Sequence, residues 1–375
     1  MQSGKTNMTQ ISTQTPVNPA SLALLREAFT ELRTTRKLRH REAAAELGVS
    51  EGEALAAFVG EHVVRLDAND AAQFAAIFET MPLLGEVMVL TRNDAVVHEK
   101  IGTFGKMSRN GPVGLTVGRA IDLRIFYAKW ASAFAVSEAY DDGVRKSLQF
   151  FDAQGVAITK VYLRDASDYA AFDALVERHA APVQQAGLTV EPAQPRAPQR
   201  DDAQVDVTGF RAAWAAMKDT HEFFDILRKF GVGRLQALRL ADPAYAEPIA
   251  LDAIDALLND AASTQLPIMV FVGNPGMIQI HTGPVQTIRT MGPWLNVLDA
   301  DFNLHLRTSL VAHAWVVRKP TSDGIVTSVE LFDAAGENIT MLFGARKPGQ
   351  AELEDWRAAL ARLPRVERVA DGASA

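Results

Sequence analysis

The stretch Phe151-Asp152-Ala153-Gln154-Gly155 returns almost unchanged further along the chain as Phe332-Asp333-Ala334-Ala335-Gly336. Residues 151 and 332 are 181 positions apart, and the same offset aligns other parts of the two halves without a gap. The matched residues are Met88-Val89 with Met269-Val270, Asn93 with Asn274, Gly102 with Gly283, Gly111-Pro112 with Gly292-Pro293, Leu123 with Leu304, and Ile158-Thr159 with Ile339-Thr340. Chance rarely keeps one register over about seventy residues, so the sequence predicts an internal duplication.

Each half has the same order of patterns, helices first and strands second. Short apolar runs separated by Gly, Asn and Asp turn signals fill 86–162 and 267–343, which is typical of antiparallel sheets. Ser50, followed by Glu53, matches the capping box of a helix start. The predicted helical regions are 20–59, 168–179, 210–230, 251–262 and 352–363. The repeated unit is therefore of the α+β class.

The composition suggests where the ordered units begin and end. Residues 1–16 are rich in Ser, Thr, Gln and Asn, and Pro182, Pro192, Pro195 and Pro198 mark the one strong linker. The expected organisation is a disordered tail (1–16), an N-terminal repeat (17–180), a Pro-rich linker (181–205), a C-terminal repeat (206–366) and a flexible tail (367–375).

Charge and composition exclude several classes of protein. The chain has 38 Lys and Arg against 45 Asp and Glu, a net charge of −7, which argues against a nucleic-acid-binding protein. No apolar run reaches the length of a membrane span, and residues 1–16 lack the apolar core of a secretory signal. We therefore expect a cytoplasmic protein that does not span a membrane. The lack of cysteine excludes disulfides, thiolate metal sites and cysteine nucleophiles, and nucleotide-binding and serine-hydrolase fingerprints are also missing.

His221 is the most informative histidine. Phe210, Trp214, Met217, His221 and Phe224 recur at steps of four, three, four and three, so they are predicted to share one apolar helix face. An imidazole there is either a satisfied core histidine or a ligand to a flat apolar group, and haem suits the second reading. The other histidines are expected to be structural or exposed. They are His40, His62, His98, His179, His281, His305 and His313.

Haem also carries two propionates, which bind Arg or Lys at the rim of a pocket. Candidate cations are Arg234, Arg318-Lys319 and Arg346-Lys347. The alternative for each is a solvated surface charge.

Longer motifs run in one order along nearly the whole chain, from about Leu22 to Leu363. They are Arg92-Asn93 to Gly102-Thr103-Phe104, Asp122-Leu123-Arg124-Ile125-Phe126, Trp130-Ala131-Ser132, Gln149-Phe150-Phe151-Asp152, Asp219-Thr220-His221-Glu222-Phe223-Phe224, Met269-Val270-Phe271-Val272-Gly273-Asn274, Gly292-Pro293-Trp294-Leu295-Asn296 and Arg318-Lys319-Pro320-Thr321-Ser322-Asp323-Gly324. These motifs resemble the bacterial cytoplasmic haemin-utilisation family of HemS, HmuS and ChuS. The resemblance implies two similar repeats, each with a large antiparallel β-sheet flanked by helices, and one b-type haem on the C-terminal half.

The resemblance also assigns roles to particular residues. It places the axial iron ligand on His221, a distal-side arginine on Arg124 and a distal aromatic on Phe126. The propionate contacts fall on Arg234, Lys319 and Arg346. The chain departs from some relatives at Met341 and Phe343, where those relatives have glutamine and tyrosine, so hydrogen-bonding groups near the haem edge are lost here.

Two functions follow from the resemblance. In the first, the protein holds haem through His221 during bacterial haem uptake and exchanges it with an inner-membrane importer or a downstream haem-degrading enzyme. In the second, it is itself a haem oxygenase-like enzyme that opens the macrocycle and releases iron, with Arg124 acting on the distal side. An ion pair with Asp122 is the structural alternative for Arg124.

Overall fold

A computed structural model describes residues 19–366, apart from 142, 194, 196–197 and 348. The two predicted tails, 1–16 and 367–375, lie outside the described residues. The helices are α1 (Pro19–Thr35), α2 (His40–Glu46), α3 (Glu51–Ala56), α4 (Ala71–Phe78), α5 (Tyr169–His179), α6 (Val207–Ala215), α7 (Glu222–Phe230), α8 (Arg234–Leu240), α9 (Ala253–Thr264) and α10 (Glu354–Ala361). Ser50 and Glu53 form the predicted capping box at the start of α3.

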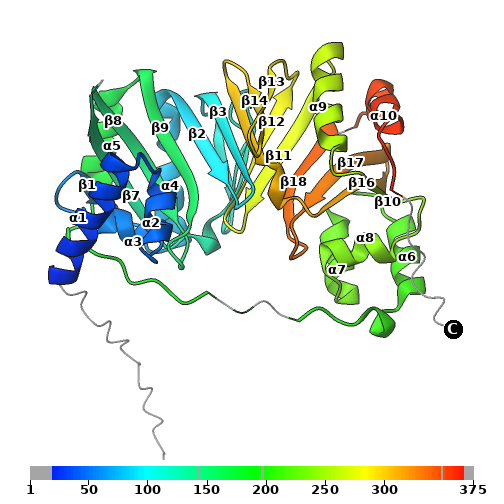
Figure 1. Ribbon diagram of the computed structural model, residues 1–375, viewed down its shortest axis with the longest axis horizontal. Helices are drawn as coiled ribbons and strands as arrows, with labels where there is room; N and C mark the ends of the chain where they lie inside the picture. The colour runs from blue at the N-terminus through cyan, green and yellow to red at the C-terminus, as the bar shows by residue number, and fades with distance from the viewer. Residues whose placement is uncertain (1–18, 142, 194, 196–197, 348, 367–375) are drawn as a thin grey trace, which may run out of the picture.

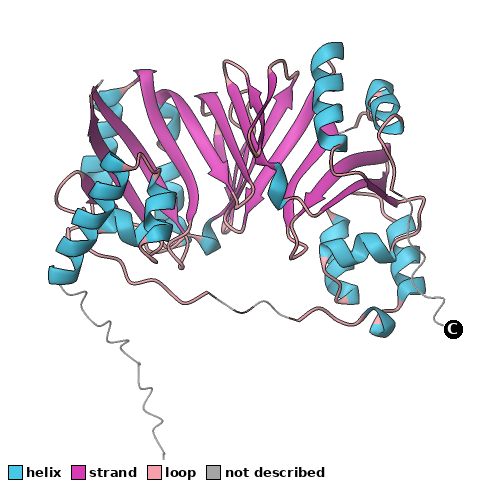
Figure 2. Cartoon of the chain, viewed as in Figure 1, coloured by secondary structure: helices cyan, strands magenta, loops and turns pink. Residues whose placement is uncertain are grey.

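In the described part of the chain, the strands form two nine-stranded antiparallel sheets (Figure 2). In the first half they are β1 (Val63–Arg65), β2 (Gly85–Arg92), β3 (Val96–Thr103), β4 (Met107–Asn110), β5 (Val113–Thr116), β6 (Leu123–Phe126), β7 (Ser132–Tyr140), β8 (Gly143–Phe151) and β9 (Ala157–Ser167). In the second half they are β10 (Ala246–Ile249), β11 (Ile268–Asn274), β12 (Met277–Gly283), β13 (Ile288–Met291), β14 (Trp294–Leu298), β15 (Phe302–Arg307), β16 (His313–Thr321), β17 (Gly324–Phe332) and β18 (Asn338–Gly344). The predicted α+β duplication is confirmed.

Each sheet is built from both halves of the chain. Sheet 1 has the order β1-β7-β8-β9-β2-β3-β15-β14-β13, and sheet 2 has the order β10-β16-β17-β18-β11-β12-β6-β5-β4. Strands β4–β6 therefore leave the first repeat and extend the sheet of the second, while β13–β15 make the reciprocal exchange. The sequence did not predict this exchange. The domain boundaries at 180 and 206 stay a prediction.

Two matched asparagines join the halves where the sheets meet. The Asn93 amide donates to the carbonyl oxygens of Gly273 (3.1 Å) and Ile339 (2.8 Å). The Asn274 amide donates to those of Arg92 (3.0 Å) and Ile158 (2.8 Å). These are the same contacts made in opposite directions, as the 181-residue offset requires.

Helices cover both faces of each sheet (Figure 1). Phe74 of α4 and Phe172 of α5 pack on one face of sheet 1, and α1–α3 pack on the other. Helices α9 and α10 pack on one face of sheet 2, and α6–α8 cover Trp315 and Val317 on the other. The packing of α6–α8 on sheet 2 positions the candidate site, because the segment that joins α6 to α7 contains His221.

Candidate functional site

The chain turns a corner between α6 and α7, and this overturns the prediction of one continuous helix face. Phe210, Trp214 and Met217 are buried as expected, but the His221 side chain is 91 % exposed and Phe224 is 61 % exposed. Helix α6 ends at Ala215, and α7 begins at Glu222 after the N-cap residue His221. Between the two helices the Asp219 carboxylate accepts the backbone N–H of His221 (2.8 Å), a bond typical of a turn.

The same carboxylate orients the imidazole of His221. Asp219 Oδ1 lies 2.7 Å from His221 Nδ1, so Nδ1 carries the proton and donates it. Nε2 has no hydrogen-bond partner among the described residues, and its lone pair faces outward. Donation from both His221 groups, together with the positive charge of Arg346, lowers the pKa of Asp219. A carboxylate-bonded imidazole with a free Nε2 is the usual form of a metal-binding histidine.

Phe223, rather than His221, points into the core beneath this corner. Its ring packs 4.7 Å from that of Trp214, and two cations lie over it, Lys319 Nζ at 4.5 Å and the Arg234 guanidinium at 5.4 Å from the ring centroid. Helix α7 therefore binds to sheet 2 through Phe223 and presents Phe224 and His221 outward.

Arg234 and Lys319 share one buried glutamate. Glu330 Oε2 accepts from Arg234 Nε (2.7 Å), and Glu330 Oε1 accepts from Arg234 Nη2 (2.8 Å) and Lys319 Nζ (2.9 Å). Burial lowers the pKa of Lys319 to about 8, while the two cations hold the pKa of Glu330 far below its usual range. Two of the three predicted propionate contacts, Arg234 and Lys319, are thus hydrogen-bonded to Glu330. The cluster of these three residues has a net charge of +1. Their role at a ligand rim stays a prediction.

Arg346 lies at the His221 end of the site. Its guanidinium is 3.4 Å from Asp323 Oδ2, and its charge acts on Asp219.

The face of sheet 2 beyond α7 carries half-buried apolar side chains. The strand register places Met341 and Phe343 of β18, Phe271 of β11 and Ile278 of β12 on this face, and the rings of Phe271 and Phe343 are 5.0 Å apart. Apolar side chains therefore occupy the centre of this face.

Arg124 lies on the same face, opposite Ile278, with Phe126 two residues further along β6. It reaches this position only because β6 has crossed to the other sheet. Its guanidinium donates to the Asp122 carboxylate, whose pKa burial raises against the effect of Arg124. The ion pair weighed as the structural alternative is present, and a distal role for Arg124 stays a proposal.

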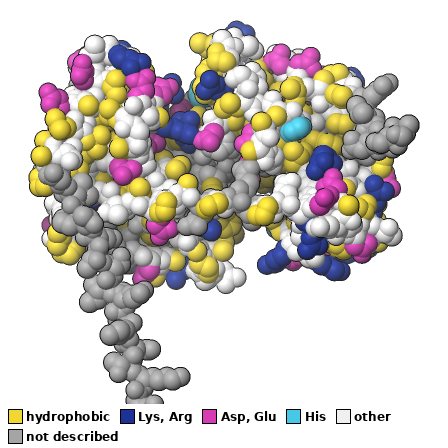
Figure 3. All heavy atoms as spheres, turned by 60° about the horizontal axis from the view of Figure 1, so that its bottom comes forward, with side chains coloured by type: hydrophobic (Ala, Val, Ile, Leu, Met, Phe, Trp, Pro, Cys, Tyr) yellow, Lys and Arg dark blue, Asp and Glu magenta, His cyan; other side chains and the backbone are white. Residues whose placement is uncertain are grey.

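A groove of about 1090 Å³ runs between the two halves. Phe224, Arg234, Phe271, Ile278 and Met341 line it from the second half. This volume lies slightly above the usual range for small-molecule sites, about 300–1,000 Å³. Figure 3 shows the lower face of the molecule, where hydrophobic and Lys or Arg side chains lie side by side around the junction of the halves.

These groups fit a haem. The arrangement offers one histidine with a free Nε2, an apolar face and groove large enough for a macrocycle, and cationic side chains for carboxylates. No cluster of three or more His, Asp or Glu residues that could hold a metal ion occurs in the described ranges.

Comparisons with known proteins show the family of this chain. The model of the haemin-degrading HemS.ChuX domain matches residues 48–179 and again 231–363. The hemin transport protein HmuS of Yersinia pestis is 40 % identical over 327 residues, covering 86 % of this chain and 92 % of that protein. The chain belongs to the HemS family.

Solved structures of HemS-family proteins superpose on nearly the whole chain. Holo-PhuS, a heme-binding protein from Pseudomonas aeruginosa, has a TM-score of 0.89 and 46 % identity, covering 93 % of this chain and 100 % of that one. The heme degrading enzyme ChuS from Escherichia coli O157:H7 has a TM-score of 0.84 and 36 % identity, covering 92 % and 99 %. Within the described residues of this HemS-family chain, no helix is long and apolar enough to cross a membrane.

Arg92 is a groove residue that sequence reasoning missed. It ends β2 and lines the groove from the first half, and the one hydrogen bond of its side chain within the described chain is from Nε to the carbonyl of Asn93 (3.3 Å). Burial and the neighbouring charge of Arg41 lower its pKa to about 10. An arginine so poorly paired in a groove is suited to bind an anion. The sequence motif Arg92-Asn93 does not predict a groove residue, because the groove forms only where the two halves of the chain pack together.

Of the residues predicted from the sequence, Arg234 lines the groove together with Met341. His221 and Arg346 gather at the α7 end, Lys319 lies beneath it, and Arg124 and Phe126 lie along the sheet face. The predicted residues thus follow one side of sheet 2 but do not converge on one point.

Proposed function

We propose that this protein binds one haem per chain, with His221 Nε2 as the axial ligand of the iron and the face of sheet 2 supporting the macrocycle. The observation that carries the proposal is the hydrogen bond from His221 Nδ1 to Asp219, which leaves an exposed imidazole with a free Nε2 just before helix α7. Phe224 of the same helix lines the large groove. The names of the relatives HmuS and PhuS, a hemin transport protein and a heme-binding protein, support haem as the ligand.

The exposure of His221 favours a carrier. A ligand that is 91 % exposed can meet haem held by another protein and release it again without a large opening of the fold. We propose that the protein takes haem from an inner-membrane importer in the cytoplasm and passes it to a downstream enzyme.

Haem degradation is the second candidate, favoured by the similarity of the chain to ChuS, a heme degrading enzyme. Haem, when bound, supplies an iron centre for O₂ chemistry. Arg124 shares the sheet face with the groove residue Ile278, and it would contribute a charged donor once released from Asp122. Ring opening that persists with catalase present and is lost in Arg124→Ala would establish the enzyme. Bleaching that catalase abolishes in both proteins would establish the carrier.

The test of binding is a haemin titration of the full chain, followed by the Soret band. We expect saturation at one equivalent, and a large loss of affinity with a changed spectrum in His221→Ala. His313→Ala removes another exposed histidine and serves as the control. An unchanged titration in His221→Ala would overturn the ligand assignment.

A further inference from the structure

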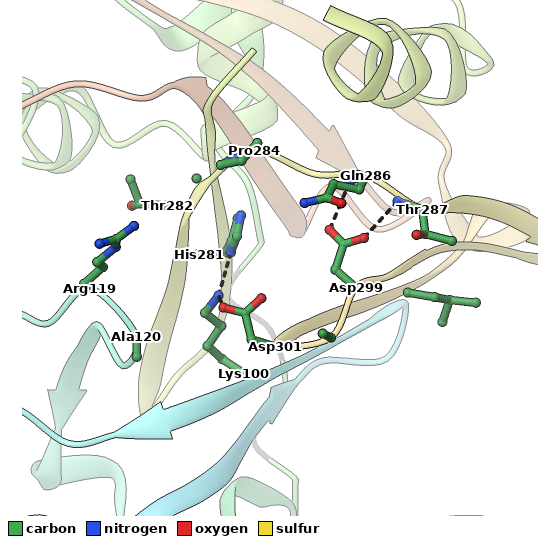
Figure 4. Close-up of a pocket in the computed structure, with 13 residues that line it drawn as sticks. Lys100, Arg119, Ala120, His281, Thr282, Pro284, Gln286, Thr287, Asp299 and Asp301 are labelled. Carbon is green, nitrogen blue, oxygen red and sulfur yellow. Dashed lines mark hydrogen bonds and ion pairs between the residues drawn. The ribbon is translucent and has the colours of Figure 1, made fainter. Parts of the chain in front are cut away.

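A second cavity, of about 570 Å³, lies at the junction of the two halves and shares no lining residue with the groove. Lys100 of β3 and Arg119, which precedes β6, line it from the first half (Figure 4). His281 of β12 and the loop residues Asp299 and Asp301 line it from the second half.

The floor of this cavity is a hydrogen-bonded trio. Lys100 is buried, and its Nζ donates to Asp301 Oδ2 (2.7 Å) and His281 Nδ1 (3.3 Å). An ammonium group has three N–H donors. The third N–H has no hydrogen-bond acceptor in the described chain, so Lys100 keeps one donor for a ligand.

His281 is a neutral wall of the cavity. Burial and the charge of Lys100 lower its pKa to about 4. Because Nδ1 accepts from Lys100, the ring proton is on Nε2, and Nε2 has no partner in the described chain. The ring stacks on Phe302 at 3.8 Å. An apolar back wall of this kind strengthens the interactions that Lys100 makes in front of it.

Among the charged groups of the cavity, one anion, Asp299, and one cation, Arg119, have no ion-pair partner in the described chain. Asp301 is paired with Lys100, and Asp299 accepts the backbone N–H groups of Gln286 (3.0 Å) and Thr287 (2.8 Å). Arg119 lines the opposite wall with no hydrogen bond or ion pair to the described part of the chain. Its planar guanidinium suits two-point binding of a carboxylate.

Among the described residues this trio occurs once, because Lys100 and His281 are equivalent positions of the two repeats and the position equivalent to Asp301 is Ala120. The 181-residue offset matches Lys100 with His281, and Ala120 with Asp301, so the two copies have diverged at these positions. Burying a lysine is costly unless it is paired. Packing does not require a lysine at position 100, because an apolar side chain would fill the same space.

We propose that this cavity binds a small hydroxylated monocarboxylate. Its carboxylate is held by Arg119 and the free N–H of Lys100, and its hydroxyls donate to the oxygens of Asp301 and Asp299. A phosphate dianion is disfavoured because the charges of Lys100, Arg119, Asp299 and Asp301 sum to zero, so its second negative charge would meet no further cation.

The proposal is tested with sodium gluconate, titrated into the haem-free full chain at constant ionic strength. The imidazole ¹H–¹³C signal of His281 is followed by NMR and assigned by its loss in His281→Asn. We expect a saturable shift in the wild type, at least tenfold weaker binding in Arg119→Gln, and unchanged binding in Arg109→Gln. Arg109 is an exposed arginine of β4 that bonds to the carbonyl of Gly111.

Absence of a saturable shift, or equal binding in Arg119→Gln and the wild type, would overturn the site. Inorganic phosphate that binds as tightly as gluconate would overturn the assignment to a monocarboxylate. Lys100→Met, with its fold checked by circular dichroism, must weaken gluconate binding as well, and unchanged binding there would contradict the role of Lys100.

Discussion

Two hydrogen bonds from His221, from its backbone N–H and from Nδ1, converge on Oδ1 of Asp219. The first holds the turn that precedes helix α7, and the second fixes the tautomer of the ring. One carboxylate therefore ties the local fold to the orientation of the proposed iron ligand.

Replacement of Asp219 by Asn should weaken haem binding by about tenfold, because partners of this kind orient the ligand and raise its basicity. The iron–histidine stretching band of the ferrous complex should move to lower frequency, and the midpoint potential should rise. Resonance Raman spectroscopy and a redox titration measure these changes. Asp225→Asn, on the exposed side of α7, is the control, and identical spectra in the two variants would contradict the role of Asp219.

Arg92→Leu should weaken haem binding by about tenfold, the value of one charge-assisted hydrogen bond. It should leave binding of haem dimethyl ester unchanged, since the ester has no anionic propionate. Arg41 also lines the groove but is paired with Asp94, so Arg41→Leu should have a smaller effect. Soret titrations with both ligands measure this, and an equal loss with the ester would show that Arg92 does not act through a propionate.

At the scale of elements, the sequence predicted the helices and strands well but not the corner between α6 and α7. The apolar steps from Phe210 to Phe224 fit a continuous helix as well as two helices at an angle. The signal that separates them is Asp219, a turn-forming residue type three positions before Glu222 begins α7. A turn at Asp219 would place His221 outside the core.

The turn asparagines also act at this scale, since each ties one half to the other. Asn274→Ala removes bonds to the carbonyls of Arg92 and Ile158, and should lower the free energy of unfolding by about 2–3 kcal/mol. Asn259→Ala, on the exposed side of α9, should change it by less than about 0.5 kcal/mol. Urea denaturation measures both, and equal values would contradict the linking role.

At the scale of the whole molecule, the 181-residue offset made the duplication predictable, as the reciprocal bonds of Asn93 and Asn274 show. The strand exchange was not predictable, because alternation of apolar residues identifies a strand but not its partner. Neither Arg124 nor Arg92 can therefore be placed from the sequence. Arg124 reaches sheet 2 only because β6 crosses over, and the Arg92 groove forms only between the two halves.

The junction of the halves should also make the fold sensitive to acid. Burial holds the pKa of His281 at about 4 and that of His98 well below its ordinary value. Between about pH 6.5 and 4 the unfolded chain binds protons that the folded chain excludes, so stability must fall as the pH falls through this window. His281 alone accounts for on the order of 3 kcal/mol. Urea denaturation at pH 7 and pH 5 measures the loss, and His98→Leu should reduce it. An equal loss in that variant would contradict a contribution from His98.

Every step of the proposed function depends on His221 as the iron ligand. The most direct measurement is the iron–histidine band of the ferrous haem complex in the wild type and in His221→Gly, before and after addition of imidazole. We predict a band in the wild type, its absence in His221→Gly, and its return when imidazole fills the space. A band that persists in His221→Gly without imidazole would show that another residue binds the iron.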